Sequence, residues 1–395
     1  MKKAHITIIS FPHPPHVNPT LPIVSVLVRR GHRVTYGTSD RFASRVAELG
    51  AEIVPCPAFR IDTLSDGADE KESWQPYFRL AIGTLTEMAR FYEGNRPDLM
   101  IYDSMAFAGR IFANRWGIQS IQINPSFAHD KENWSQQVKD PDFRKWLLES
   151  RKHADHFLEQ HGIVASDSLF HREKLNIHLF PKALQPKGDV FGEEFFYAGR
   201  CAGEQPYYGD WQRRDTEGRP IVLVSTSTSY LQGPRFFRMC IDALSDLQWH
   251  VILSIGDSCD AASLAPLPAH FEIVQHTSHI KMLPHVSLFI CLGGIITTAE
   301  AAYHGIPLVV TTHGFPELEW QADNIEDLGI GIHVRKAETN ADTLRSLAVR
   351  VLGDRELLNR VRRMQRTVQR EPGAEETVNR IEEYLETFCW EPSRF

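Results

Sequence analysis

Residues 5–36 read HITIISFPHPPHVNPTLPIVSVLVRRGHRVTY, and this segment decides the fold. The β-branched run His5–Ser10 predicts a buried strand. After a loop rich in proline and histidine, apolar residues recur at helical spacing over Thr20–Arg30, and Gly31 ends that helix. A second strand is expected at Arg33–Tyr36. The order of strand, loop, helix and strand is typical of a parallel α/β sheet.

The same alternation continues along the chain in two runs. In the first run, further strands are expected at 51–56, 98–103 and 120–124, with helices at 41–49 and 105–116. A second run begins at Pro220, with strands at 221–225, 251–255, 273–274, 288–291 and 308–311 and helices at 235–247, 298–303 and 318–328. The pattern predicts an α/β protein with two doubly wound parallel sheets, each covered on both faces.

Length and composition exclude several classes of protein. With 395 residues the chain is long enough for two or three domains. Its 43 basic and 50 acidic side chains give a formal charge of -7, which argues against a nucleic-acid-binding surface. No apolar run approaches the roughly 20 residues that span a bilayer, and Ile6–Ser10 is too short for a signal-peptide core. We therefore expect a cytoplasmic protein without a membrane span.

Several common site motifs are missing from the sequence. The six cysteines lie far apart with no C-x-x-C pair, so we expect reduced thiols and no metal site. The loop after the first strand contains no glycine, which argues against the G-x-G-x-x-G turn of dinucleotide-binding dehydrogenases. P-loop and G-x-S-x-G motifs are also missing, which argues against P-loop hydrolases and typical serine hydrolases.

Two ionisable residues directly follow strands of the first predicted sheet. Parallel sheets bind ligands beyond the carboxyl ends of their strands, where His16 and Asp103 both fall. A carboxylate beside an imidazole fixes its tautomer and stabilises its cation, so the two residues together would form a general base. Alternatively, His16 packs under the neighbouring prolines and Asp103 caps the next helix. His13, in the same loop, is a competitor for the role of base.

A second candidate site lies where residues 291–300 pass from a strand through a glycine pair into a helix. The helix start offers free amides, and Thr297 and Thr298 add hydroxyl donors, so a diphosphate could bind beside Gly294. Glu300 could accept hydrogen bonds from sugar hydroxyls. The alternative is a capped helix with no ligand.

These positions together resemble a known family. The shared motifs are His16-Val17-Asn18-Pro19, Arg30 to Tyr36, Asp103, Pro181 to Pro186, and Gly293-Gly294 leading to Glu300-Ala301 and Gly305-Ile306-Pro307. In that order they resemble the macrolide-type, UDP-glycosyltransferase-like, inverting glycosyltransferases. The resemblance implies a GT-B fold, in which two doubly wound Rossmann-like domains face a cleft. It also implies metal-independent transfer of a sugar from a UDP- or TDP-sugar to a hydroxyl of a hydrophobic natural product, with no cofactor.

Domain boundaries follow from composition and from this resemblance. We expect an acceptor-binding domain at 1–203 and a linker at 204–218, where glycine, polar and aromatic residues show no periodicity. A nucleotide-sugar-binding domain would follow at 219–374. The last helix, within 375–395, would cross back onto the first domain.

The resemblance also assigns roles to individual residues. His16 would deprotonate the acceptor hydroxyl and Asp103 would orient it. Eight residues would bind the donor: Ser227, Thr228, His276, Gly294, Thr297, Thr298, Glu300 and Glu317. Three aromatic residues, Trp74, Phe78 and Phe91, would contact the acceptor, although aromatic residues at helical spacing are often simply core.

The donor site departs from the family pattern repeatedly, including Ser278-His279 in place of a Pro-Gln pair. His276 replaces the aromatic residue that stacks on the donor base, and Leu292 replaces a histidine that contacts the diphosphate. Leu318 replaces a sugar-binding glutamine after Glu317, Ser227 replaces a glycine, and Ile296 replaces a glycine of the phosphate loop. Isoleucine disfavours the positive φ that glycine permits, which predicts a changed shape for that loop.

These departures leave two alternatives to sugar transfer. The protein could have kept the fold and lost transfer, and act as a metabolite-binding or partner protein or catalyse a different proton transfer. A sugar-nucleotide epimerase of similar architecture is a third hypothesis. A homodimer is compatible with all three.

Overall fold

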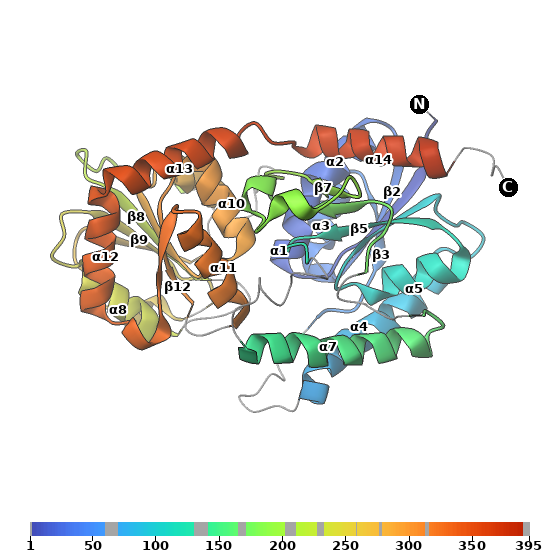
Figure 1. The fold of residues 1–395 in the computed structure, drawn as a ribbon, viewed down its shortest axis with the longest axis horizontal. Helices are drawn as coiled ribbons and strands as arrows, with labels where there is room; N and C mark the ends of the chain where they lie inside the picture. Colours follow the sequence, from blue (N-terminus) through green and yellow to red (C-terminus); the bar gives the residue numbers. More distant parts are fainter. Residues whose placement is uncertain are drawn as a thin grey trace. The chain divides into compact units, whose positions relative to one another are not determined.

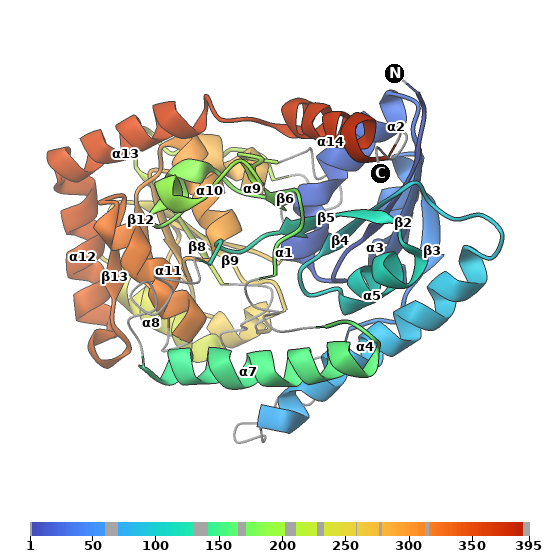
Figure 2. The same cartoon turned by 45° about the vertical axis from the view of Figure 1, so that its right-hand side comes forward.

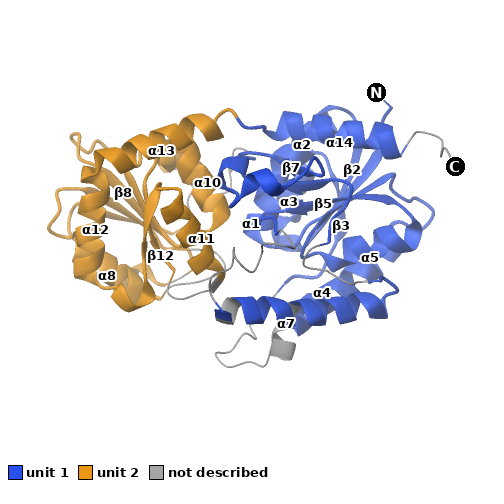
Figure 3. Cartoon of the chain, in the orientation of Figure 1, with its two compact units in different colours: residues 1–203, 371–395 blue, residues 204–370 orange. Residues whose placement is uncertain are grey.

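The structure is a computed structural model that divides into two compact units (Figure 3). Unit 1 comprises Met1–Gly203 and Glu371–Phe395, and unit 2 comprises Glu204–Arg370. The residues described are 2–59, 70–129, 141–164, 171–201, 211–226, 233–257, 259–275, 279–312 and 316–389.

Unit 1 is built on a parallel sheet. Within the described residues the sheet has seven strands in the order β3-β2-β1-β4-β5-β6-β7. The strands are β1 (His5–Ile9), β2 (Arg33–Thr38), β3 (Glu52–Pro55), β4 (Leu99–Asp103), β5 (Gln119–Asn124), β6 (Asn176–His178) and β7 (Phe195–Tyr197). The chain order reverses at β1, so the loops after β1 and β4 leave the sheet side by side, which is where α/β sheets bind ligands.

Helices cover both faces of this sheet (Figure 1). On one face the core is formed with α2 (Leu21–Arg29), α3 (Asp40–Glu48) and α14 (Ala374–Phe388). On the other face it is formed with α4 (Glu70–Phe91), α5 (Phe107–Trp116) and α7 (Pro141–Gln160), and α4 and α7 lie side by side in both Figure 1 and Figure 2. A single turn, α1 (Pro14–Val17), follows β1.

The C-terminal helix α14 is a structural part of unit 1. Val378 and Leu385 are fully buried in the same core as α2. Glu382 accepts from the buried His32 ring at 3.0 Å and from Arg30 at 2.5 Å. Burial opposes ionisation of Glu382, but these two donors outweigh it and hold the pKa of its carboxyl below the ordinary value.

The segment that leads into α14 passes very close to Gly199. This glycine has a φ of +62°, and an added Cβ would lie 1.9 Å from the carbonyl oxygen of Pro372. We expect Gly199→Ala to lower the free energy of unfolding of unit 1 by about 2 to 5 kcal/mol, through backbone strain and overpacking. The control is Gly94→Ala, where φ is +71° and no atom lies within 4 Å, so that only the strain term applies. Urea denaturation measures the free energy of unfolding of both variants. If Gly199→Ala and Gly94→Ala lower it equally, the close approach of Pro372 to Gly199 does not contribute.

Unit 2 repeats the α/β plan. Within the described residues its parallel sheet has six strands in the order β10-β9-β8-β11-β12-β13. The strands are β8 (Ile221–Ser225), β9 (His250–Ser254), β10 (Phe271–Val274), β11 (Leu288–Cys291), β12 (Leu308–Thr311) and β13 (Gly331–Val334). The helices are α8 (Pro234–Leu244), α9 (His279–Met282), α10 (Ile295–His304), α11 (Pro316–Asp327), α12 (Ala341–Gly353) and α13 (Arg355–Val368). α12 packs on α8, and α13 packs on α10.

The two parallel-sheet units confirm the predicted α/β fold class. Three strands were not predicted, namely β6, β7 and β13. β6 and β7 have three residues each, and β13 begins at Gly331, so none shows a long apolar run. The six cysteines are all free, and none of the described helices combines the length and apolar character that a bilayer crossing requires.

Candidate active site

His16 stands in the short helix α1 at the carboxyl end of β1. Pro14 and Pro15 occupy the first positions of this helix, where their fixed φ suits a helical turn. The turn is closed by hydrogen bonds from the amides of His16 and Val17 to the carbonyl of His13, both 3.0 Å long. The helix therefore directs the His16 ring toward the adjacent strand end, that of β4.

Asp103 is the last residue of β4, and its carboxylate lies against His16. Oδ2 is 2.7 Å from His16 Nδ1, and the exposed fractions of the two side chains are 0% for Asp103 and 17% for His16. Oδ1 accepts a hydrogen bond of 2.8 Å from the amide of Met105. Asp103 thus accepts from the turn after its strand and also pairs with His16. The N-cap of the next helix, α5, is Ala106 and has no side-chain cap, so the expected alternative in which Asp103 caps that helix is wrong.

This contact determines what the imidazole can do chemically. A buried carboxylate at Nδ1 favours the tautomer in which Nδ1 carries the proton, and this leaves Nε2 as a proton acceptor. No hydrogen bond to Nε2 is present among the described residues. His16 can therefore take a proton at Nε2, while Asp103 stabilises the resulting imidazolium.

His13, the competing histidine, lies in a different environment. Burial, reinforced by the nearby His16 and Arg41, lowers the pKa of His13 to about 4. Its ring centroid lies 6.5 Å from that of His16, in an edge-on arrangement. The carboxylate of Asp103 contacts His16, so His16 is a histidine of this loop that has a carboxylate partner.

A chain of aromatic rings begins at His16 and runs to α4. The His16 and Phe11 ring centroids are 5.0 Å apart, and Phe11 stacks on Tyr77 at 5.6 Å. Tyr77 in turn contacts Phe59 at 4.8 Å and Trp74 at 5.1 Å. We name these five aromatic residues beside His16 the aromatic cluster: Phe11, Phe59, Trp74, Tyr77 and Phe78, the last of which stacks on Trp74 at 6.0 Å.

The three residues predicted to contact the acceptor separate in the structure. Trp74 and Phe78 lie in the aromatic cluster, but Phe91 does not. At roughly 1.5 Å per residue, Phe91 lies about 25 Å further along α4 than Trp74, where its ring packs against Tyr92. Phe11 and Phe59 were not predicted, although both follow strand ends, the rule that selected His16.

The glycine pair of unit 2 forms the turn before α10. Gly293 has a φ of +79°, and an added Cβ would meet Val310 at 2.6 Å, so glycine is required there. Gly294 is the N-cap of α10, and an added Cβ at this position would meet no atom within 4 Å. The turn therefore leaves open space at Gly294, beside the first free amides of the helix.

Two expectations for this turn need correction. The hydroxyl of Thr298 donates to the Gly293 carbonyl at 3.2 Å and the residue is 2% exposed, so it supports the turn and does not face a ligand. Ile296 lies within α10 and has helical φ, so the predicted distortion by a β-branched residue does not arise. Thr297 and Glu300 are both partly exposed.

Glu317 is partly exposed in the first turn of α11 and accepts from Gln321 Nε2 at 3.3 Å. Leu318, which takes the place of the expected glutamine, is buried. A network that was not predicted fixes this helix: the buried His333 ring lies 3.0 Å from Asp323 and 3.4 Å from Glu319. The other predicted donor residues, Ser227, Thr228 and His276, lie outside the described residues.

Comparison with known proteins identifies the family. Residues 238–384 match the family model described as "Erythromycin biosynthesis protein CIII-like, C-terminal domain". The chain is 34% identical over 390 residues to NDP-glycosyltransferase YjiC of Bacillus subtilis (strain 168), with 98% of both chains covered. The chain belongs to the macrolide-type glycosyltransferases. This glycosyltransferase is also 30% identical to demethyllactenocin mycarosyltransferase of Streptomyces fradiae, covering 97% of this chain and 87% of the relative.

Solved structures confirm the GT-B fold of this glycosyltransferase. The crystal structure of CalG4, the calicheamicin glycosyltransferase, superimposes with a TM-score of 0.81 at 30% identity, covering 98% of this chain and 99% of CalG4. The resemblance inferred from the motifs is thereby confirmed. The comparisons favour a transferase over a fold that has lost transfer and over an epimerase.

Proposed function

We propose that this glycosyltransferase moves a sugar from a UDP- or TDP-sugar to a hydroxyl of a hydrophobic natural product, such as a polyketide, a macrolide or a phenolic, with inversion at the anomeric carbon. The observation that carries the proposal is the 2.7 Å contact between His16 Nδ1 and Asp103 Oδ2. The names of the relatives, which specify an NDP donor, demethyllactenocin and calicheamicin, support the donor and acceptor classes.

The proposed reaction is a single displacement. His16 Nε2 takes the proton of the acceptor hydroxyl as the acceptor oxygen bonds to the anomeric carbon. The bond from that carbon to the diphosphate oxygen breaks, and the nucleoside diphosphate leaves with the electron pair. Attack from the face opposite the leaving group inverts the carbon, and Asp103 stabilises the imidazolium.

The environment of His16 supports a hydrophobic acceptor. The aromatic cluster begins in ring contact with His16, and its members Trp74 and Phe78 continue it along α4. Aromatic faces favour apolar and aromatic guests, and a low-polarity surrounding strengthens the effect of the Asp103 charge on the base.

The start of α10 supports binding of the donor diphosphate in unit 2. Unpaired amides and the positive end of the helix dipole attract anions, and Thr297 adds a partly exposed hydroxyl. Glu300 and Glu317 would accept hydrogen bonds from the sugar hydroxyls. Because this turn neutralises part of the diphosphate charge, we propose that no metal ion or cofactor takes part.

The reaction class is tested by incubating the protein with UDP- and TDP-sugars and a panel of hydrophobic alcohols and phenols. We expect a glycoside whose anomeric configuration, read by NMR, is opposite to that of the donor. A product with retained configuration would contradict the direct displacement. Failure of UDP, TDP and GDP to bind in calorimetry would instead favour a protein that has lost transfer.

Chelation tests the absence of a metal. We expect the rate of sugar transfer to change by less than about twofold when EDTA is added in excess, because the amides and dipole of α10 supply the positive charge. Transfer rates with and without EDTA, and after readdition of Mg²⁺, measure this. A loss with EDTA that Mg²⁺ restores would show that the diphosphate needs a cation.

Gly294→Ala tests whether the diphosphate approaches the backbone of the turn. Since an added methyl group would meet no protein atom, we expect an unchanged melting temperature and a Kd for UDP or TDP about tenfold higher. The control is Gly353→Ala, in the same unit, where an added Cβ also meets nothing within 4 Å. Equal affinity in both variants, measured by calorimetry, would place the diphosphate elsewhere.

A further inference from the structure

Tyr36, the last residue of the motif Arg30 to Tyr36, has no part in the proposed reaction, yet it lies beneath the loop that carries His16. Tyr36 belongs to β2, and its side chain is fully buried. The residue opposite it on β1 is Ile8, two positions before Ser10, after which the loop begins. The phenol of Tyr36 is therefore placed at the base of the loop.

The phenol holds the far end of this loop through Thr20. Tyr36 Oη lies 2.7 Å from Thr20 Oγ1, and Thr20 Oγ1 donates to the carbonyl of Val17 at 2.7 Å. A hydroxyl has one proton, so Thr20 gives its proton to Val17 and accepts from Tyr36. Val17 follows His16 directly and ends α1, so the chain of bonds reaches the backbone beside the base.

The bond from Tyr36 to Thr20 requires that the phenol keeps its proton. Burial raises the pKa of Tyr36 far above its ordinary value, so the phenol stays protonated and remains a donor at physiological pH. The Tyr36 phenol thus remains able to donate to Thr20, at the end of the loop that carries His16.

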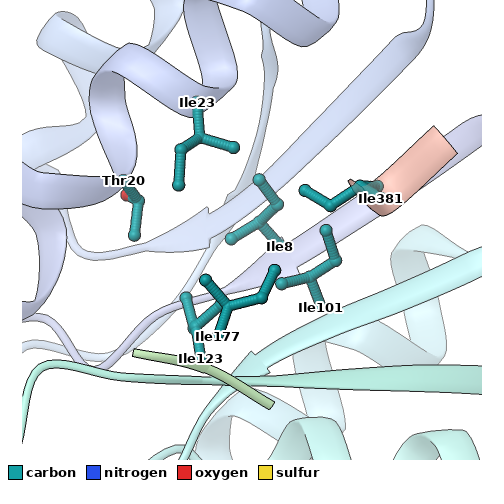
Figure 4. A pocket seen from close by; sticks show the side chains of 7 residues that line it. All are labelled: Ile8, Thr20, Ile23, Ile101, Ile123, Ile177 and Ile381. Atoms are coloured by element: carbon teal, nitrogen blue, oxygen red, sulfur yellow. The ribbon is translucent and has the colours of Figure 1, made fainter. Parts of the chain in front are cut away.

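Among the described residues, the hydroxyl of Thr20 forms hydrogen bonds to Val17 and Tyr36. Thr20 lines a small cavity of about 10 Å³ with six isoleucines, Ile8, Ile23, Ile101, Ile123, Ile177 and Ile381, drawn in Figure 4. Neither His13 nor Val17, the N-cap residues of the two turns in this loop, forms a side-chain cap. The hydrogen bond from Thr20 to the Val17 carbonyl is thus a side-chain contact that holds the end of α1, beside a longer contact of 3.5 Å from Arg45 to Asn18.

We propose that Tyr36 is a positioning residue for the base, acting through Thr20 and Val17 to hold the His16 ring in contact with Asp103. The inference rests on the proposed role of His16 as the base. It predicts that removing one buried hydroxyl, which touches no substrate, lowers the rate of the chemical step, because small displacements of a catalytic group reduce rates steeply.

Tyr36→Phe tests the proposal against Tyr92→Phe as a matched control. Tyr92 is also a fully buried tyrosine of unit 1, and its phenol is hydrogen-bonded to Thr7 and, at 2.8 Å, to Thr35, outside the loop. We expect Tyr36→Phe to lower kcat by about tenfold or more with the KM for the nucleotide sugar within about twofold. Tyr92→Phe should leave kcat within about twofold. Equal losses in the two variants would reduce Tyr36 to a merely structural role and overturn the proposal.

Two further measurements separate positioning from folding. Thr20→Val should lower kcat as Tyr36→Phe does, and Thr20→Ser, which keeps the hydroxyl, should retain at least about half of kcat. In ¹⁵N NMR of the folded protein, His16 should be protonated at Nδ1 in the wild type and show mixed tautomers in Tyr36→Phe. An unchanged tautomer with unchanged kcat would overturn the proposal. If His16→Ala retains transfer, the base itself is wrong, and this is distinct from a Tyr36 variant that has no effect.

Discussion

His16→Ala should lower kcat of sugar transfer by about 10²- to 10⁴-fold, the usual contribution of a general base. The variant loses the only group that we propose to accept the hydroxyl proton. It should still bind UDP or TDP with unchanged affinity, since the donor residues belong to unit 2. Initial rates at saturating donor and calorimetry with the nucleotide measure the two quantities separately.

The matched control for this substitution is His13→Ala. His13 lies in the same loop, and burial lowers its pKa to about 4, but the carboxylate of Asp103 contacts His16. We expect His13→Ala to keep kcat within about tenfold of the wild type. If kcat fell equally in both alanine variants, or did not fall in His16→Ala, His16 would not be the base.

Asp103→Asn should give the second largest loss, again about 10²- to 10⁴-fold in kcat. The amide has nearly the same shape, and its oxygen can still accept from the amide of Met105, so the fold should persist. Its NH₂ group would then face His16 Nδ1 and favour the tautomer with the proton on Nε2. In that tautomer His16 cannot accept the proton of the acceptor.

The double variant tests whether the two residues act as a unit. If Asp103 acts only through the imidazole, adding Asp103→Asn to His16→Ala should cost almost nothing more, as residues of one catalytic unit are not additive. Single and double variants are compared by kcat under the same conditions. If the reduction in kcat of the double variant equals the product of the two single reductions, Asp103 has an independent role.

Much of this arrangement could be predicted because it follows from the sheet. Strands with continuous apolar runs are recognisable in sequence, and the ends of parallel strands meet at one edge. The pattern placed His16 and Asp103 each after the end of a strand, and the adjacency of β1 and β4 in the structure brings the two residues together. The glycine pair before α10 could also be recognised in the sequence. A strand that turns directly into a helix needs a residue with positive φ, which glycine adopts without strain.

Other features depend on side-chain direction, which periodicity does not encode. Phe91 shares α4 with Trp74 and is apolar like it, but the length of the helix separates the two residues. Thr298 and Thr297 are neighbours in sequence, and only the geometry of the turn sends one hydroxyl back to Gly293. The role inferred for Tyr36 depends on contacts between residues that are separated in the chain.

The position of α14 has a consequence for how the protein is made. Val378, Ile381, Tyr384 and Leu385 complete the core around α2, yet the ribosome adds them only after the whole of unit 2. While unit 2 is being translated, the part of unit 1 already synthesised therefore lacks α14, and the apolar face of α2 that α14 covers stays exposed. Proteins usually fold their N-terminal domain first during synthesis, whereas the core of unit 1 can be completed only after unit 2 has been synthesised. A nascent chain stalled before residue 378 would accordingly be a substrate for chaperones.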